Sequence, residues 1–214
     1  MATGVTNVML GVQNTGETIW NGAWTNVAPD KTRNADIIAS YAASNGNIEA
    51  YDLTIESDLN FNSGTTNSVV VAGDLTINGT FTIGDQESLV MYKNDAIITG
   101  NITKLESSTF RNDIYDITYW SSPIANANVG TVFTGVDPNR IWYYDQSQST
   151  ESEPPVDYND PTSTYWNTWV VASGLMTPGV GYAAEGPLQT GTHDISFTGR
   201  PNNGNISFDI YELP

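Results

Sequence analysis

A four-residue sequence that recurs at a fixed interval constrains this chain most. Residues 52–55 read Asp-Leu-Thr-Ile, and residues 74–77 read the same 22 positions later. Beyond this repeat, Leu59 aligns with Phe81 at the same interval. Short apolar triplets about 20 residues apart, with Gly and Asn between them, are typical of stacked β-solenoid coils. A coil of this kind can bury its inward side chains only by stacking on a neighbouring coil, so the repeat predicts a β-solenoid.

A third and looser copy extends the pattern. It aligns at an interval of 21 residues: Ile98, Gly100 and Ile102 follow Ile77, Gly79 and Phe81. Ile48 is a candidate for an earlier and less regular coil. The alternative is an antiparallel meander, because Asn-Gly at positions 78 and 79, between two apolar strands, is also the signal of a type I′ hairpin. We favour the solenoid over the meander.

From about residue 110 the expected strands become longer and more aromatic. They cover residues 114–120, 140–145, 165–173, 180–185, 194–199 and 206–213. The last two alternate apolar and polar residues around a turn-forming segment, which predicts a hairpin. We therefore expect an all-β protein in which a short parallel β-solenoid (β-helix), residues 1–109, is followed by an antiparallel β-sandwich or jelly-roll-like unit, residues 110–214. The two regions would have separate cores or one continuous core.

Composition excludes several classes of partner and site. The net charge of −17 argues against nucleic acid and anionic membrane surfaces, which both attract cationic proteins. Without cysteine the chain has no disulfide framework and no thiolate metal site, and it has a single histidine. No apolar run approaches the roughly 18–20 residues that span a bilayer, so membrane insertion is not expected. Asn, Thr, Ser and Gly make up 84 of 214 residues, a composition that favours an extracellular β protein.

Adjacent aromatic residues on the expected strands are the best candidates for ligand binding. Neighbouring residues of a strand point to opposite faces, so one ring of each pair can line a core while the other faces solvent or a second layer. Exposed flat rings suit the C–H-rich faces of sugars. The candidate ligand-binding residues are Trp120, Trp142, Tyr144, Trp166 and Trp169. The alternative is that both faces of the sheet are covered and all these rings are structural.

An acidic segment gives a second, metal-binding hypothesis. Hard divalent cations prefer several carboxylate and carbonyl oxygens, so calcium is a possible cofactor. The candidate ligands are Asp145, Glu151, Glu153, Asp157 and Asp160. Their spacing matches no calcium motif, and the alternative is a solvated loop whose charges serve solubility. No carboxylate pair stands out as an acid–base pair, and His193 is expected to be incidental. We therefore do not expect an enzyme.

Four sequence blocks carry a resemblance to a group of secreted proteins. They are residues 18–24 with 28–30, residues 116–123, residues 176–182 and residues 197–204. In this order the blocks resemble the extracellular region of surface or adhesin-like proteins that Bacteroidota export by type IX secretion. The resemblance implies export, display or release at the cell surface, and a stalk or binding role. It implies no catalytic residues.

These observations lead to one expected function. We expect a non-catalytic extracellular module, secreted or at the bacterial cell surface, for adhesion or glycan recognition. The low cationic content favours a neutral glycan, or an anionic glycan bridged by calcium. The start of the chain lacks a basic and apolar leader, so we read it as an excised segment with flanking domains in a larger parent chain. The alternatives are a purely structural stalk or spacer module, or a polysaccharide-degrading enzyme.

Overall fold

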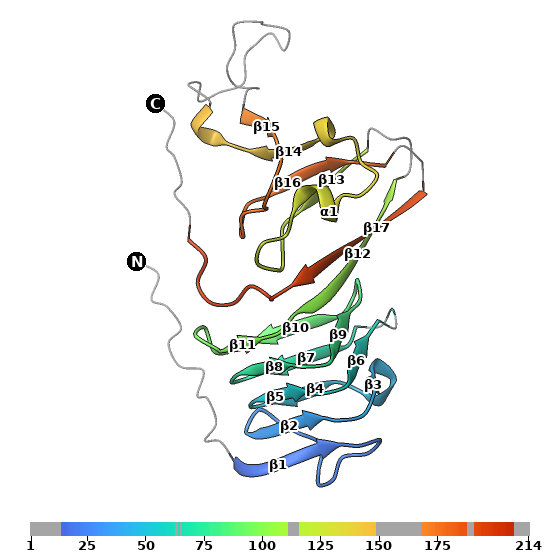
Figure 1. The fold of residues 1–214 in the computed structure, drawn as a ribbon, viewed down its shortest axis with the longest axis vertical. Helices are drawn as coiled ribbons and strands as arrows, with labels where there is room; N and C mark the ends of the chain where they lie inside the picture. The colour runs from blue at the N-terminus through green and yellow to red at the C-terminus, as the bar shows by residue number, and fades with distance from the viewer. Residues whose placement is uncertain are drawn as a thin grey trace, which may run out of the picture. The chain divides into compact units, whose positions relative to one another are not determined.

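The computed structural model describes residues 14–62, 64, 66–110, 116–148, 168–187 and 191–207 (Figure 1). The chain divides into two compact units, Met1–Lys104 and Leu105–Pro214. This division lies within β12 (Ile102–Phe110), as does the boundary that we expect from the sequence between residues 109 and 110. Strands account for 47% of the structure and helices for 8%, with a β-solenoid in the first unit and an antiparallel sheet in the second, as expected from the sequence.

The first unit is a parallel β-solenoid of about four turns. One sheet contains β1 (Asn14–Trp20), β2 (Arg33–Ile37), β5 (Leu53–Ile55), β8 (Leu75–Ile77) and β11 (Ile98–Thr99). A second contains β4 (Ile48–Ala50), β7 (Ser68–Val71) and β10 (Ser88–Met91). The third contains β3 (Tyr41–Ala42), β6 (Asp58–Phe61), β9 (Thr80–Ile83) and the start of β12 (Ile102–Phe110), with the short 3₁₀ helix η1 (Ala43–Asn45) after β3.

The pairing register confirms the 22-residue repeat. Leu53 pairs with Leu75, and Leu59 pairs with Phe81, in parallel strands of successive coils. These side chains point inward and are buried, so like residues stack on like residues along the solenoid axis. Ile48 belongs to the earlier coil, as expected, where it pairs with Val69.

The third copy of the repeat differs from its expected alignment in one strand. Ile98 pairs with Leu75, an interval of 23 residues, and not with Ile77. In the next strand the interval is 21, as expected. The corner between these strands is therefore two residues shorter in the fourth coil than in the third. Gly100 closes this tighter corner with a φ of +87°, a conformation that residues with a Cβ rarely adopt.

The Asn-Gly pair that suggested a hairpin forms a solenoid corner instead. It separates β8 from β9, which belong to different sheets. Gly79 is required there for space, because a Cβ at this position would lie 2.7 Å from the Ser57 carbonyl carbon in the coil before. The Thr80 N–H donates to the Ser57 carbonyl oxygen over 3.1 Å and keeps the two corners together.

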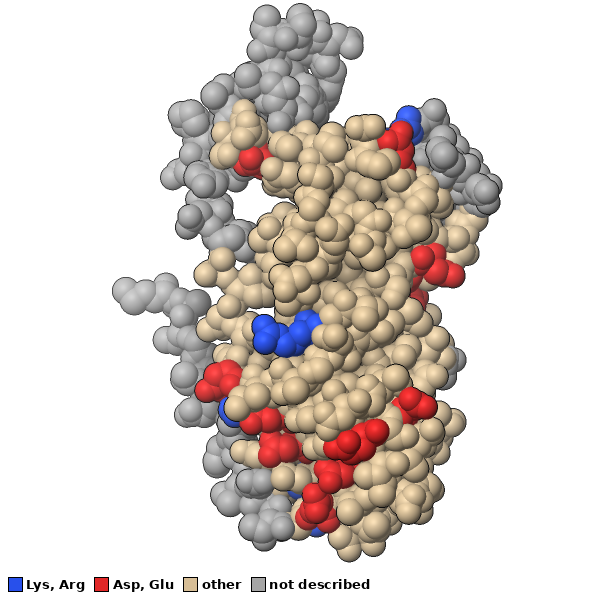
Figure 2. Space-filling view, viewed as in Figure 1, with Lys and Arg blue, Asp and Glu red and all other residues tan. Residues whose placement is uncertain are grey.

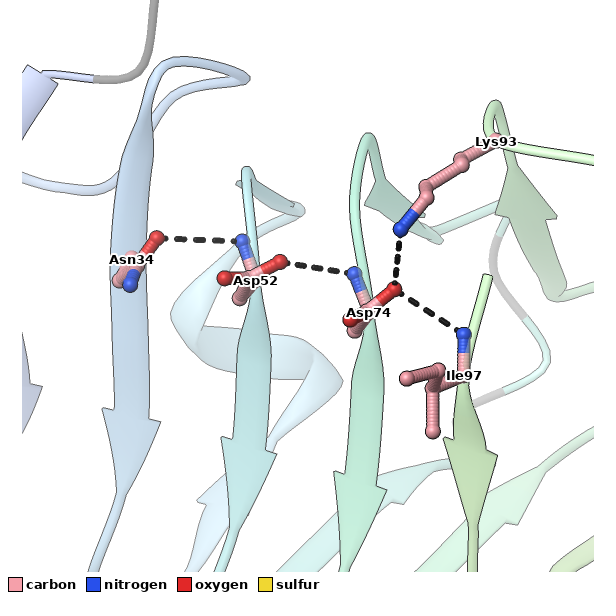
Figure 3. A network of polar contacts seen from close by, with 5 residues as sticks. All are labelled: Asn34, Asp52, Asp74, Lys93 and Ile97. Carbon is pink, nitrogen blue, oxygen red and sulfur yellow. Dashed lines mark hydrogen bonds and ion pairs between the residues drawn. The ribbon is translucent and has the colours of Figure 1, made fainter. Parts of the chain in front are cut away.

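The repeated aspartate has a structural role that Figure 3 shows. The backbone N–H of Asp52 donates to Asn34 Oδ1 over 3.4 Å, and that of Asp74 donates to Asp52 Oδ1 over 2.7 Å. Asp74 Oδ1 in turn accepts from the Ile97 N–H at 3.0 Å and from Lys93 Nζ at 2.9 Å. The Lys93 ammonium is the main reason that the pKa of Asp74 is lowered. Each side chain thus satisfies a backbone donor of the next coil.

The first resembling block packs at the first coil. Its Trp20 ring lies 4.7 Å from the ring of Tyr41 and 5.4 Å from that of Trp24, measured between centroids. The Trp20 indole N–H donates to the Ser40 carbonyl oxygen over 3.1 Å. Tyr41 also stacks parallel to Phe61 of the following coil. Trp20 and Tyr41 are buried in this aromatic cluster, which therefore forms part of the core at the first coil.

The second unit contains a four-stranded antiparallel sheet. In spatial order its strands are β13 (Ile117–Trp120), β16 (Tyr182–Glu185), β14 (Ile141–Tyr144) and β15 (Trp169–Val171). The unit also contains β17 (Gly191–Gly199) beside β12, the short helix α1 (Val129–Val132), and the 3₁₀ helices η2 (Pro138–Arg140) and η3 (Gln146–Gln148). Phe133, Ile141, Tyr182 and Phe197 are among its buried residues. The strand expected at residues 206–213 lies mostly outside the described residues. No helix in the described parts of the chain is long and apolar enough to cross a membrane.

Two further resembling blocks contact each other in this unit. The Asn202 side-chain amide donates to the Ser122 carbonyl oxygen over 2.8 Å, and the Asn202 backbone N–H donates to the Pro123 carbonyl oxygen over 2.9 Å. The Ala125 N–H donates to the Arg200 carbonyl oxygen over 2.8 Å. These contacts join residues about 80 positions apart, so both blocks serve the scaffold of the unit.

Candidate ligand-binding face

One face of the four-stranded sheet is lined by aromatic and aliphatic side chains that are exposed or, for Trp142, partly exposed. We call it the aromatic face; it consists of Ile117, Tyr119, Trp142, Tyr144, Trp169 and Val171 around the small residue Ala183. The register places these residues together, because Tyr119 and Trp142 both pair with Ala183, and Tyr144 pairs with Trp169. Residues directly opposite in antiparallel strands lie on the same face of a sheet. The expected common face of Trp142 and Tyr144 is therefore present.

The opposite face of the same sheet contains buried side chains in its two central strands, β16 and β14. Ile141, Tyr182 and Ala184 point to that side and are each at most 4% exposed. Tyr119, by contrast, is 68% exposed, and Trp169 is 40% exposed. Since the core formed by the described residues of the unit packs against this side of the sheet, the alternation of side chains leaves the rings of the other side at the surface.

Trp120 does not join the other candidate residues. It lies on the side of the sheet that packs against the core, where it is partly exposed and its ring centroid is 6.3 Å from that of Phe133. Its neighbour Tyr119 occupies the aromatic face in its place. The sequence shows that these two rings point in opposite directions, but it does not show which of them faces the core.

The rings surround a shallow hollow. Ile117, Tyr119, Trp142 and Trp169 line its sides, Ala183 contributes its small side chain, and the volume is about 280 Å³. The Trp169 ring lies 5.4 Å from Tyr144 with an interplanar angle of 70°, and 6.2 Å from Tyr119 with an angle of 45°. The rings thus contact each other at an angle and form an uneven surface in place of a flat one.

The aromatic face carries almost no charge. Glu185, which pairs with Ile117, is the one charged residue in the four described strands of this sheet. Its Oε2 forms an ion pair with Nη1 of Arg140, which immediately precedes β14. The Glu185 side chain is 12% exposed and that of Arg140 is 33% exposed. In the view of Figure 2 most of the acidic side chains lie over the solenoid strands instead.

Most of the expected metal ligands fall outside the described residues. This applies to Glu151, Glu153, Asp157 and Asp160, and also to the ligand-binding candidate Trp166. Asp145 is described and caps η3. Its Oδ1 accepts from the N–H and Oγ of Ser147 at 3.1 and 2.6 Å, and its Oδ2 accepts from Gln148 at 3.0 Å.

These hydrogen bonds, those of Ser147 first, lower the pKa of Asp145. Among the residues that the structure describes, no group of three or more His, Cys, Asp or Glu side chains could hold a metal ion. The calcium hypothesis for residues 145–160 stays a prediction. It is tested by comparing the melting temperature with calcium and with EDTA.

A second hollow, of about 300 Å³, lies beside α1 in the same unit. Phe133, Ile141 and Ser173 contribute to its lining, which contains no titratable side chain. His193 lies in β17 and is buried. Neither feature resembles a catalytic constellation, which needs nucleophilic or acid–base groups that converge on a cleft.

Comparison with known proteins gives a family without an assigned activity. The chain belongs to the family described as "Domain of unknown function (DUF8693)", whose sequence model matches residues 13–213. The match covers both units, so the solenoid and the antiparallel unit are parts of the same family domain. Searches of curated proteins and of solved structures gave no significant match.

Proposed function

We propose that this DUF8693 domain is a non-catalytic extracellular module for cell-surface adhesion or glycan recognition, and that the aromatic face is its binding surface. One observation carries the proposal: aromatic side chains of three strands are exposed on one side of a sheet whose other side contains buried core residues. Contiguous exposed apolar surface is costly in water and often marks a site of interaction.

The chemistry of the aromatic face suits a sugar. Ring faces such as those of Trp142 and Trp169 pack against the C–H groups of a pyranose. The hydroxyl groups of Tyr119 and Tyr144 both donate and accept hydrogen bonds, as sugar hydroxyls do. Mostly apolar surface with a few polar groups that fix orientation is the usual composition of a small-molecule site.

Charge favours a neutral ligand over an anionic one. The whole chain has a formal net charge of −17, which repels a polyanion at a distance. The aromatic face itself has no excess positive charge, because Arg140 is paired with Glu185. An anionic glycan would need bridging calcium.

The proposed setting is the outside of a bacterial cell, either secreted or surface-bound. It rests on the low charged-residue content and on the four blocks that resemble Bacteroidota proteins exported by type IX secretion. In such a protein the domain would be one module of a larger chain.

A glycan array followed by titration tests the proposal. The wild-type chain is expected to bind at least one glycan, and Tyr119→Ala or Trp169→Ala is expected to weaken that binding at least tenfold. Tyr92→Ala is the matched control, because Tyr92 is an exposed aromatic residue of the solenoid. The proposal would be contradicted if Tyr119→Ala and Trp169→Ala both bound the glycan as the wild type does, or if the wild-type chain bound no glycan at all.

A structural spacer is the second candidate. It is favoured by the scaffold contacts of the resembling blocks, exemplified by Trp20 in the first coil and Asn202 in the second unit. Those contacts would explain the blocks without any ligand. A domain that binds nothing on the array, but keeps its stability when the aromatic face is replaced by polar residues, would support this candidate.

A further inference from the structure

The aromatic face has three properties that together define a class of ligand. Building on the proposed function, we propose that it binds one or a few units of a soluble, neutral glycan, and that the Arg140–Glu185 pair sets the preference for uncharged sugars. The three properties are the tilt of the rings, the size of the hollow and the paired charges beside it.

The tilt of the rings disfavours a flat, crystalline polysaccharide. Such a surface requires rings that lie in one plane, so that several of them contact it together. Here the Trp169 ring makes angles of 45° with Tyr119 and 70° with Tyr144. Rings set at such angles can instead contact different sides of one dissolved sugar.

The size of the hollow limits how much ligand can be enclosed. Its volume of about 280 Å³ is at the small end of the range of roughly 300–1,000 Å³ that is usual for ligand pockets. Four large side chains bound it, from Ile117 on β13 to Trp169 on β15. A long chain would therefore place a few units against the rings and leave the others in solvent.

The ion pair borders the hollow and has no net charge. Glu185 is two residues from Ala183 on β16 and pairs with Ile117, and both of these residues line the hollow. Arg140 supplies N–H donors and Glu185 supplies acceptors, a combination that matches neutral hydroxyl groups. A sugar carboxylate or sulfate would meet a guanidinium whose charge is already balanced by Glu185, and would be repelled by that carboxylate.

Calorimetric titration of the wild-type chain gives the first test. The ligands are cello-, xylo-, manno- and malto-oligosaccharides of one to six units, and oligogalacturonates of the same lengths. We expect one neutral series to bind, with an affinity that stops rising after the first few units. Oligogalacturonates should bind at least tenfold more weakly, and insoluble crystalline cellulose or chitin should not pull the protein down.

Glu185→Gln gives the second test. It keeps the shape of the side chain and frees the charge of Arg140, so it should reduce the preference for neutral sugars by improving oligogalacturonate binding at least tenfold relative to the neutral ligand. Asp194→Asn is the matched control, because it removes one negative charge from an exposed strand residue of the same unit. The control should leave selectivity unchanged.

The outcomes separate this inference from the proposed function. If a glycan binds and Trp169→Ala abolishes the binding, the proposed function stands. The neutral, short-glycan inference is then overturned by any of four results: oligogalacturonates that bind as tightly as the neutral series, affinity that rises over the whole length series, pull-down by a crystalline polymer, or unchanged selectivity of Glu185→Gln. If no glycan binds to the wild-type chain, both the inference and the proposed function are wrong.

Discussion

Gly79→Ala tests how closely the solenoid coils approach each other. A glycine-to-alanine change at an ordinary φ normally stabilises a protein by about 0.4–1 kcal/mol, because it restricts the unfolded chain. Gly79 does not have a positive φ, so backbone strain gives no reason for the opposite result. Lack of space does give a reason to expect destabilisation. The new Cβ would lie 2.7 Å from the Ser57 carbonyl carbon and 2.9 Å from the Ser57 nitrogen, whereas ordinary contact begins at 3.4 Å.

The expected cost follows from the hydrogen bonds at this corner. Backbone atoms cannot turn away as a side chain can, so the corners of the two coils must separate. That movement weakens two hydrogen bonds: the one that the Thr80 N–H donates to the Ser57 carbonyl oxygen over 3.1 Å, and the one that the Gly79 N–H donates to the Ile55 carbonyl oxygen over 2.9 Å. Each backbone hydrogen bond contributes about 1 kcal/mol net, and a buried group left without a partner costs about 1–3 kcal/mol. We therefore expect a loss of about 2–4 kcal/mol.

Urea unfolding followed by tryptophan fluorescence measures this loss. With a slope of about 2 kcal/mol per molar urea, the midpoint of the solenoid transition should fall by about 1–2 M. Gly130→Ala is the control, because the nearest atom to its added Cβ is 3.5 Å away and its φ is negative; its midpoint should not fall. A Gly79→Ala protein that unfolds at or above the wild-type midpoint would refute the close approach of the coils.

Three further predictions concern the core, the pH response and the rings. Phe81→Ala should cost about 3–5 kcal/mol in the same urea experiment, since Phe81 is buried inside the solenoid, and a loss below about 1 kcal/mol would argue against that burial. Burial, with Glu17 nearby, raises the pKa of Asp36 to about 6. The stability that Asp36 contributes is therefore present at low pH and lost as the pH rises through 6. The melting temperature of Asp36→Asn should exceed that of the wild type at pH 8, and the two should converge toward pH 4. A difference in melting temperature that does not depend on pH would contradict this prediction. Acrylamide should quench Trp169 efficiently and Trp20 poorly, so Trp169→Phe should remove part of the accessible fluorescence, and quenching that stays the same would mean that Trp169 is covered.

The solenoid could be predicted from the sequence because its stacking leaves a direct trace. Side chains that meet between coils, such as Leu53 and Leu75, are alike and equally spaced. The pairing of Ile98 could not be obtained by counting, because the corner closed by Gly100 is two residues shorter than the one before it. The length of a corner depends on its backbone conformation, which the spacing of apolar residues does not predict.

The aromatic face could be predicted only in part. Strand alternation is enough to place Trp142 and Tyr144 on one side of a sheet. Choosing between Tyr119 and Trp120 requires knowing which side the core covers, and this depends on the packing of residues such as Phe133. Ala183 and the Arg140–Glu185 pair contribute to the aromatic face through contacts between segments about 40 residues apart, so no local sequence pattern predicts these contributions.

The hydrogen bonds that run from Asn34 through Asp52 to Asp74 link each rung of the stack only to the next one. Such a structure resembles a ladder whose length is set by how many times its unit is copied. Duplicating residues 53–74 would add one rung of roughly 4.8 Å, the spacing of neighbouring strands, and would leave every existing bond between rungs with an equivalent. Evolution or a protein engineer could therefore change the reach of this domain in even steps without redesigning its ends.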